Sequence, residues 1–418
     1  MKLISEALGL DKVFFLEAIE GEAGVPLAMK TTPSTARIDK QLLENMYRDN
    51  PVVFNAINKV VQIIMSADYK LVAKNPKVED FFRKFLDGIG YRGGERFWDD
   101  LLETFFKFQV IYGDAWCELI YNKKGNRIVD LDAIDPKKMD YAKTGSQKIA
   151  LDENGNPIGY VQTLPPIVAA KLKVRFKPPK GSNVLLLPNQ IFIPPERIAH
   201  FKLYTVGDGF YGIGLIEPIY KTSQSKIEME RALVNAIWRA GFPTPVASVG
   251  DKDHEPTPTQ IKKIFEKIKN MNYKYGFTFP YYNKISFLEA KHPEKLREHL
   301  NYWIEQEITG MGLAKAFATG SGEATNRATL QRQEYILKLT LKDIVKRTVR
   351  GIESKIFRRI AELEGFKEVP RLEWGELALE ELDAKVSRII GLAKQNLITA
   401  DAELENFLRK LENLPNKK

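Results

Sequence analysis

Two long helical stretches that bracket a short mixed segment constrain this fold more than any other feature of the sequence. Residues 217–239 run for about 23 residues without an internal helix breaker, a length of roughly 35 Å at 1.5 Å per residue. Pro218 falls in the first turn, where a missing N–H group costs nothing. A second helix is predicted over residues 293–309. Together the two helices bracket the segment that lies between them in the sequence.

The segment between the two helices has a different periodicity. Strands are predicted over residues 246–249, 277–279 and 285–288, and a helix over residues 259–270. A small α/β unit is therefore inserted between the helices. The domain around it is predicted to be discontinuous in sequence.

The first half of the chain divides into an arm, a helical part and a β-rich part. Residues 1–38 mix short apolar pieces with Gly, Pro, Ser and Thr, and we interpret them as a loosely held arm that a partner could order. Apolar spacing then predicts helices over residues 39–47, 52–67, 78–86 and 96–112, with a strand at 69–73. Period-two patterns predict strands over residues 115–121, 127–132, 148–151, 158–163, 184–187, 190–193 and 197–204. Residues 164–182, rich in Pro, Lys and Gly, are predicted to be an exposed loop.

The last quarter of the chain is predicted to be helical after a Gly-rich loop. The loop, residues 310–325, contains four glycines, and a very long helix over about 327–364 follows it. Residues 375–413 are helical again, with a break at 396–401 where Thr399 can cap the last helix. The whole pattern predicts an α+β fold.

Composition excludes several classes of protein. The chain has 418 residues, enough for two to four domains, and a formal net charge of +9. No apolar run reaches about 18 residues, so no membrane span is predicted and an intracellular, soluble protein is expected. One Cys and four scattered His residues predict neither a disulfide nor a zinc site, and no cofactor is indicated.

Two Gly-rich motifs raise the question of nucleotide binding. Residues 207–212 match G-x-G-x-x-G after a strand and before a helix, but that strand ends a meander and no β-α-β unit follows. We therefore interpret this motif as a hinge that leads into a long helix. Residues 319–325 lack the Walker spacing, so a flexible connection and a loop that touches a nucleic-acid backbone both stay open. No known catalytic motif occurs, and no enzyme is predicted.

The positive charge is concentrated on one helix. Residues 338–359 hold eight basic and two acidic residues, a net charge of +6. Four of the basic residues follow an i, i+4 row: Lys338, Lys342, Lys346 and Arg350. A solvated or intersubunit face is the preferred interpretation of this row, and direct contact with DNA is the alternative.

The order of these parts resembles the portal proteins of tailed double-stranded DNA viruses, of the HK97-like type. The resemblance is carried by residues 50–64, by the strand pair at 113–121 and 131–136, and by residues 195–202 with 210–218. Residues 396–404 resemble the family's C-terminal turn. Gly214 stands where the family usually has Ser, and Asn396 stands where it has Gly.

The resemblance implies a ring, usually of twelve subunits, at one capsid vertex. Such a ring is the channel for genome packaging and ejection, assembled in the host cytoplasm, and it docks terminase, the major capsid protein and a head-tail adaptor protein. On this mapping residues 39–215 and 327–372 are the two parts of a discontinuous α/β wing, and 1–38 an N-terminal arm. Residues 216–240 and 293–309 are stem helices that bracket a small α/β clip at 241–292. Residues 310–326 are the tunnel loop and 373–418 a helical crown.

Three sets of residues follow as candidate sites. A sliding DNA requires weak contacts directed at its backbone, without base readout. The tunnel-loop candidates are Lys315, Thr319, Ser321, Asn326 and Arg327. The candidates on the channel face of the first stem helix are Lys221, Ser225, Glu228 and Asn235. The clip candidates that meet an acidic motor or neck partner are Lys262, Lys263, Lys267 and Lys269.

Two other functions stay open from the sequence. One is a non-viral, oligomeric DNA-binding scaffold that uses the basic helix at 338–359. The other is a nucleotide-dependent enzyme that uses residues 207–212 or 319–322.

Overall fold

The computed structural model divides the chain into two compact units. Unit 1 comprises Met1–Pro218 and Ile308–Lys418, and unit 2 comprises Ile219–Glu307. The structure describes residues 38–90, 97–172, 176–207, 209–241, 244–269, 283–288, 296–313, 315, 327–375, 377, 405–406 and 409. The arm at 1–37, the predicted strand at 277–279 and the cap at Thr399 lie outside the described residues.

The described part of unit 1 begins with four helices whose starts are set by local capping. Their bounds are α3 (Lys40–Asp49), α4 (Pro51–Met65), α5 (Pro76–Asp87) and α6 (Trp98–Tyr112). The Asn50 side chain accepts hydrogen bonds from the backbone N–H groups of Val52 and Val53, and Pro51 occupies the first helical position. Asn75 and Pro76 repeat this arrangement at α5. Gly113, at φ 82°, ends α6.

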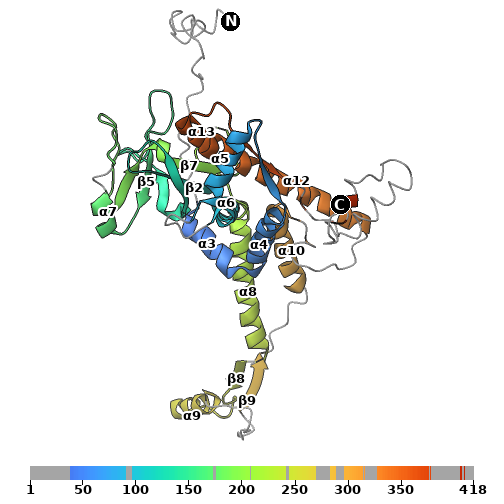
Figure 1. Cartoon of the computed structure of the whole chain (residues 1–418). Helices are drawn as coiled ribbons and strands as arrows, with labels where there is room; N and C mark the ends of the chain where they lie inside the picture. Colours follow the sequence, from blue (N-terminus) through green and yellow to red (C-terminus); the bar gives the residue numbers. More distant parts are fainter. Residues whose placement is uncertain are drawn as a thin grey trace, which may run out of the picture. The chain divides into compact units, whose positions relative to one another are not determined.

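The described strands of unit 1 form three sheets (Figure 1). The central sheet has the order β3 (Ile128–Ile134), β2 (Asp114–Tyr121), β7 (Ile198–Lys202), all antiparallel. A second sheet has the order β4 (Met139–Tyr141), β5 (Tyr160–Thr163), β6 (Gln190–Ile193), and α7 (Pro166–Leu172) packs against β6. The short 3-10 helices are η1 (Pro136–Lys138), η2 (Pro195–Arg197) and η3 (Glu217–Ile219).

Alternation along β2 separates two hydrophobic cores. Ala115, Cys117 and Leu119 face one core, which also holds Phe105 of α6 and Phe201 of β7. Trp116 faces the other core, beneath the β4–β5–β6 sheet. β2 pairs with β3 on one side and with β7 on the other, so it is the central strand, and its side chains pack into both cores.

A long helical segment closes the first core. It consists of α12 (Arg327–Ile352), a π-helical turn η4 (Glu353–Phe357) and α13 (Arg358–Glu364). The helix approaches β7 closely, since a Cβ atom on Gly351 would lie 2.5 Å from the Phe201 ring. After α13, β10 (Arg371–Trp374) pairs antiparallel with β1 (Tyr69–Val72). The N-terminal and C-terminal parts of the discontinuous unit therefore share one small sheet.

Unit 2 contains the two long helices and the small inserted segment. Its elements are α8 (Tyr220–Gly241), β8 (Thr244–Ser248), α9 (Pro258–Lys269), β9 (Lys284–Leu288) and α10 (Leu296–Gly310), which ends three residues beyond the unit's limit. β8 and β9 form an antiparallel pair, with Val246 opposite Ser286. The helix predicted at 217–239 is confirmed within three residues, and the strand predicted at 285–288 is confirmed within one.

Several sequence-based predictions for unit 1 were wrong. The loop predicted at 164–182 contains α7, because Pro166 sits at a helix start, where the ring is favourable. The strands predicted at 148–151 and 184–187 are reduced to isolated bridges, such as Lys143–Ile149 and Thr144–Val184. Strand β10 and the π turn in the long helix were not predicted. Within the described residues, no helix is both long and apolar enough to span a membrane.

Three glycines allow two backbone segments to touch in unit 1. Gly113, Gly212 and Gly214 bring the end of α6 against the connection that follows β7. A Cβ atom on Gly212 would lie 1.9 Å from the Gly113 carbonyl oxygen, a distance that no relaxation of a side chain can relieve.

We therefore expect Gly212→Ala to destabilise the protein by about 3 kcal/mol, because backbone must move to admit the methyl group. Urea denaturation measures the free energy of unfolding. Gly145→Ala is the matched control, since nothing lies within 4 Å of its added Cβ atom, and it should change stability by less than about 0.5 kcal/mol. Equal effects of the two substitutions would show that the contact is not restrictive.

Candidate nucleic-acid and docking interfaces

One face of α8 carries the four residues that the sequence predicts to line a channel. They follow one another at spacings of four, three and seven residues, so they form a single stripe along the helix. Lys221, Glu228 and Asn235 are exposed, and Ser225 is half-buried. The buried residues Ser223 and Lys226 lie on the opposite side of the helix.

A buried ion pair joins α8 to α10 within unit 2. The Lys226 Nζ atom lies 2.9 Å from Glu307 Oε2, and the two residues are 3% and 0% exposed. A charge of either sign at this depth is costly unless an opposite charge compensates it. The pair therefore fixes which face of α8 turns inward, and it leaves the stripe on the other side.

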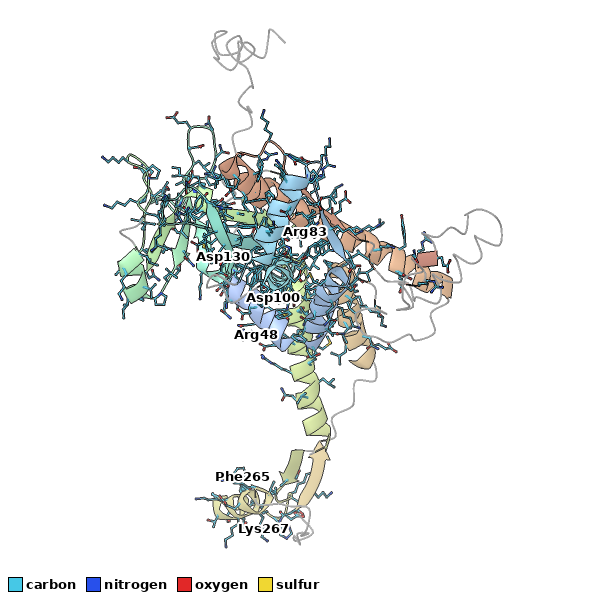
Figure 2. All side chains as sticks on the ribbon, viewed as in Figure 1. Arg48, Arg83, Asp100, Asp130, Phe265 and Lys267 are labelled. Carbon is cyan, nitrogen blue, oxygen red and sulfur yellow. The ribbon has the colours of Figure 1, made fainter. Side chains whose placement is uncertain are left out.

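The lysines of α9 are all accessible. Lys262, Lys263, Lys267 and Lys269 are exposed, and Glu266 is the single acidic residue of the helix. Two apolar side chains of α9 are exposed as well, Ile261 at 48% and Phe265 at 62%. Figure 2 labels Phe265 and Lys267 on this helix. The helix thus presents cations and apolar groups together, a combination suited to an acidic, partly apolar partner.

The predicted tunnel loop is only partly within the described residues. Lys315 is exposed, whereas Thr319, Ser321 and Asn326 lie outside the described residues. Arg327 is the first residue of α12, and its side chain is outside the description. Of these five side chains, the structure therefore describes only that of Lys315.

Only some of the basic side chains of the helical segment at 338–359 are exposed to a possible partner. Lys342, Lys346 and Arg350 of the row are exposed and Lys338 is half-buried. Other basic residues of the helix make internal contacts. The Arg347 Nε atom lies 2.8 Å from Asp343 Oδ2, Lys355 donates to the His200 carbonyl, and Arg359 donates to the Tyr121 hydroxyl at 3.2 Å. These contacts favour the structural interpretation of part of this charge.

A buried polar network, which sequence reasoning missed, centres on Asp114 and His200. Asp114 Oδ1 lies 2.8 Å from His200 Nε2 and accepts the backbone N–H of Gly212 at 2.7 Å. His200 Nδ1 lies 2.8 Å from the Tyr141 hydroxyl, which also donates to the Phe210 carbonyl at 2.9 Å. The Trp116 ring stacks on the His200 ring, 3.7 Å between centroids. Three stretches of the chain are thereby joined around one carboxylate.

Burial decides the protonation and the role of this network. Burial, together with Lys355 and Lys202, lowers the pKa of His200 to about 4, against the raising effect of Asp114, so the imidazole is neutral at pH 7. Nε2 then carries the proton toward Asp114, and the unprotonated Nδ1 shares the single hydroxyl proton of Tyr141 with the Phe210 carbonyl. Asp114, His200 and Tyr141 are at most 3% exposed, so no substrate can reach them. The network is a structural clamp between β2, β7 and the 203–216 connection.

Cys117 packs in the core, and its thiol donates to the Glu118 carbonyl at 3.6 Å. It is fully buried in β2, and burial together with Asp132 and Glu118 raises the pKa of its thiol. A protonated, inaccessible thiol is a poor nucleophile.

The G-x-G-x-x-G motif is explained by the same clamp. The Gly212 N–H group, which a phosphate cradle would need, donates to Asp114, and the Gly209 carbonyl accepts from Lys202 at 2.9 Å. Gly212 is required by its contact with Gly113. The geometry therefore supports the interpretation of residues 207–212 as a connection.

Comparison with known proteins agrees with this architecture. The chain matches the family described as "Portal protein of Mu bacteriophage" over residues 40–409.

The fold of the chain is similar to those of solved structures. One is a chain in the neck of an empty gene transfer agent particle computed with C6 symmetry, with 12% identity, a TM-score of 0.63, and coverage of 94% of this chain and 98% of that one. A chain in the neck of the native particle computed with C12 symmetry gives 12% identity, a TM-score of 0.58, and coverage of 97% and 99%. An HK97-family phage portal protein from Corynebacterium diphtheriae gives 15% identity, a TM-score of 0.47, and coverage of 84% and 99%. No curated protein sequence gives a significant match.

The fold and the family match define a structural protein of the portal class. This chain belongs to the portal protein family of Mu bacteriophage, because the match covers most of its length.

The Lys226–Glu307 pair generates a test of unit 2. Glu307→Gln should destabilise the protein by about 3 kcal/mol, because it removes the negative charge that compensates a buried ammonium group. The double variant Lys226→Met/Glu307→Leu should regain most of that loss, because it buries no charge. Thermal and urea denaturation measure both changes.

The control for this pair is Lys84→Ala, which breaks the exposed Lys84–Asp80 pair and should cost less than about 1 kcal/mol. A double variant that is no more stable than Glu307→Gln would contradict the account.

The lowered pKa of His200 in the clamp can be tested by the pH dependence of stability. The pKa of His200 falls from its ordinary 6.5 to about 4 on folding, so the unfolded chain binds one more proton between these values. Stability from this group is complete above pH 6.5 and is lost as the pH falls to 4, by about 3 kcal/mol in all. His200→Gln keeps a donor toward Asp114 but cannot titrate. Unfolding free energies measured from pH 4 to 7 should therefore fall less steeply for the variant, and parallel curves would refute the assignment.

Proposed function

We propose that this protein forms a closed ring of twelve copies at one vertex of a capsid. The ring would be the channel for genome packaging and ejection, and the docking platform for terminase, the major capsid protein and head-tail adaptor or neck proteins. The observation that carries this proposal is the family match over residues 40–409. The C12 and C6 symmetries named for the similar neck structures support a ring.

In this proposal the two units would be the wing with the crown, and the stem with the clip. Unit 1 would be the wing, discontinuous in sequence, with residues 373–418 as the crown. In unit 2, α8 and α10 would be the stem helices and residues 241–292 the clip. Residues 310–326 would be the tunnel loop. On this assignment the exposed lysines of α9 belong to the surface that meets the packaging motor and later the neck.

The stripe on α8 has the chemistry of a channel wall. It combines one cation, one anion and two neutral polar groups, so its attraction for a polyanion is small. Repetition around a ring would give many weak backbone contacts and no base readout, which lets DNA slide. The buried Lys226–Glu307 pair supports this assignment because it directs the opposite face of α8 inward.

Two alternatives carry less support. A nucleotide-dependent enzyme would need free amide donors at residues 207–212, and the Gly212 amide is already bonded to Asp114. A DNA-binding scaffold that uses the basic helix would have fewer cations for DNA than the sequence suggests, because Lys355 and Arg359 are committed to internal hydrogen bonds.

Native mass spectrometry and a DNA-packaging assay test the proposal together. The purified protein should form closed rings, and a protein that stays monomeric under all conditions, or forms open filaments, would contradict it. Lys221→Glu should reduce packaged DNA several-fold with rings intact, because a ring of carboxylates repels the phosphates. Lys315→Glu and Arg327→Glu should act in the same direction if residues 310–326 are the tunnel loop.

The matched control is Lys84→Glu, which reverses an exposed lysine on α5 in unit 1. It should leave packaging unchanged. Equal packaging by Lys221→Glu and the wild-type protein would exclude this face of α8 from the channel.

A further inference from the structure

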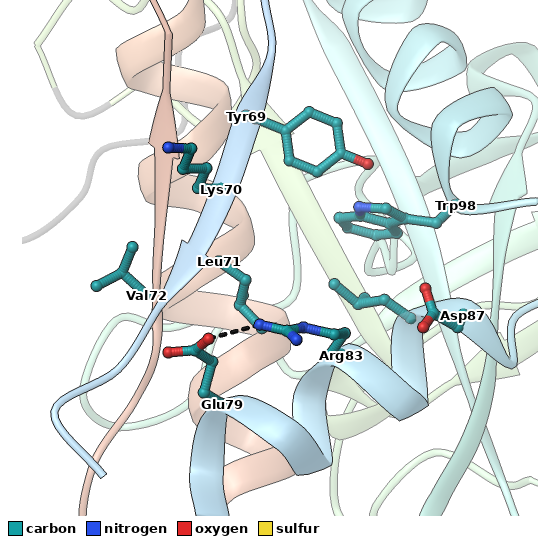
Figure 3. Close-up of a pocket in the computed structure, with 9 residues that line it drawn as sticks. Tyr69, Lys70, Leu71, Val72, Glu79, Arg83, Asp87 and Trp98 are labelled. Atoms are coloured by element: carbon teal, nitrogen blue, oxygen red, sulfur yellow. Dashed lines mark hydrogen bonds and ion pairs between the residues drawn. The ribbon is translucent and has the colours of Figure 1, made fainter. Parts of the chain in front are cut away.

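A groove lies along the free edge of β1 in unit 1 (Figure 3). Its volume is about 450 Å³, within the range of known ligand and peptide sites. Strand β1 forms one side and α5 the other, with the Trp98 side chain at one end. The lining residues are Tyr69, Lys70, Leu71, Val72, Glu79, Arg83, Leu86, Asp87 and Trp98.

The pairing of β1 with β10 shows which backbone groups face this groove. Gly375 N–H donates to the Asp68 carbonyl at 2.7 Å, and Leu372 N–H donates away from β1, to Glu353 Oε1 at 2.8 Å. Hydrogen-bonded pairs alternate along an antiparallel ladder, so Lys70 and Val72 are bonded to β10. The N–H and C=O groups of Tyr69 and Leu71 therefore point toward the groove.

The free edge of β1 can accept an extended chain as an added strand. Among the described strands β1 pairs with β10 alone, and an unpaired edge is a template for strand addition. Apolar side chains line the groove beside it, among them Leu71 and Val72, and Val72 is 39% exposed. In the Arg83–Glu79 ion pair on the α5 side, Arg83 is exposed and Glu79 is half-buried, so displacing the pair costs about 1 kcal/mol or less.

We propose that β1 accepts, as an added strand, residues 13–19 of the N-terminal arm of a neighbouring copy. That segment, Val-Phe-Phe-Leu-Glu-Ala-Ile, is rich in strand-forming residues and is bounded by charged residues on both sides. Residues 20–37 connect it to Ile38, the first described residue, and 18 residues can span up to about 60 Å. Four residues of β1 provide the pairing length.

The choice of a neighbouring copy rests on the proposed ring. A closed ring of identical subunits uses one donor surface and one different acceptor surface on each copy. One arm and one open strand edge per chain satisfy that requirement for every member. They also cover an edge that would otherwise invite aggregation.

Cysteine cross-linking in the full-length ring tests the proposal. Val72→Cys is combined in turn with a single cysteine at each of positions 13–19, and disulfides are detected on non-reducing gels. The native Cys117 is fully buried, so the background is low. Cysteines on paired strands lie about 4.5–5.5 Å apart at Cβ, so positions of one parity should give about tenfold more intersubunit product than their neighbours.

Ile167→Cys replaces Val72→Cys in the control, because Ile167 is 75% exposed on α7 and away from the groove. It should give no intersubunit ladder. The absence of a cross-link to Val72→Cys, a link within one chain only, or a repeat of three to four residues would each overturn the proposal.

Failure of this inference can be told apart from failure of the proposed function. If the ring forms and packages DNA but no cross-link appears, only the docking of the arm is wrong. If no ring forms, the proposed function itself fails.

Discussion

The hydrogen bonds of one buried carboxylate, Asp114, organise the larger part of this molecule. A carboxyl group that is 0% exposed needs hydrogen bonds from the protein in place of water, and Asp114 Oδ1 is within hydrogen-bond distance of both His200 Nε2 and the Gly212 amide. This requirement places β2, β7 and the connection toward α8 in a single arrangement. Gly113 and Gly212 carry no side chain there because their backbones touch. The clamp therefore sets where the chain leaves unit 1.

The same region is joined to the small β1–β10 sheet through the long helix. Lys355, in the π turn, donates to the His200 carbonyl, and Glu353 in that turn accepts from Leu372 N–H of β10. A π turn changes the phase of a helix, so side chains on either side of it can meet different partners. Contacts run without interruption from the clamp to the strand whose free edge forms the groove.

The sequence predicted regular elements well and long-range contacts poorly. The helix at 217–239 was predictable because nothing in it breaks a helix, and the strand pair at 115–132 because a Gly-containing turn joins two alternating runs. Strand β10 is four residues long and exists through its pairing with β1, about 300 residues earlier, which no local pattern reveals. The partners in the clamp are 86 and 59 residues apart, so no local pattern joins His200 to Asp114 and Tyr141. The stripe on α8 could be predicted from helical spacing, whereas the Lys226–Glu307 pair that orients it joins residues 81 apart.

The central claim is that α8 turns its polar stripe toward DNA in a closed ring. Electron cryomicroscopy of the assembled particle tests this most directly, because it resolves both the symmetry and the orientation of each helix. We expect a twelve-membered ring in which Lys221, Ser225, Glu228 and Asn235 line the central opening. A ring in which this face packs against a neighbouring subunit, or an assembly with no central opening, would contradict the account.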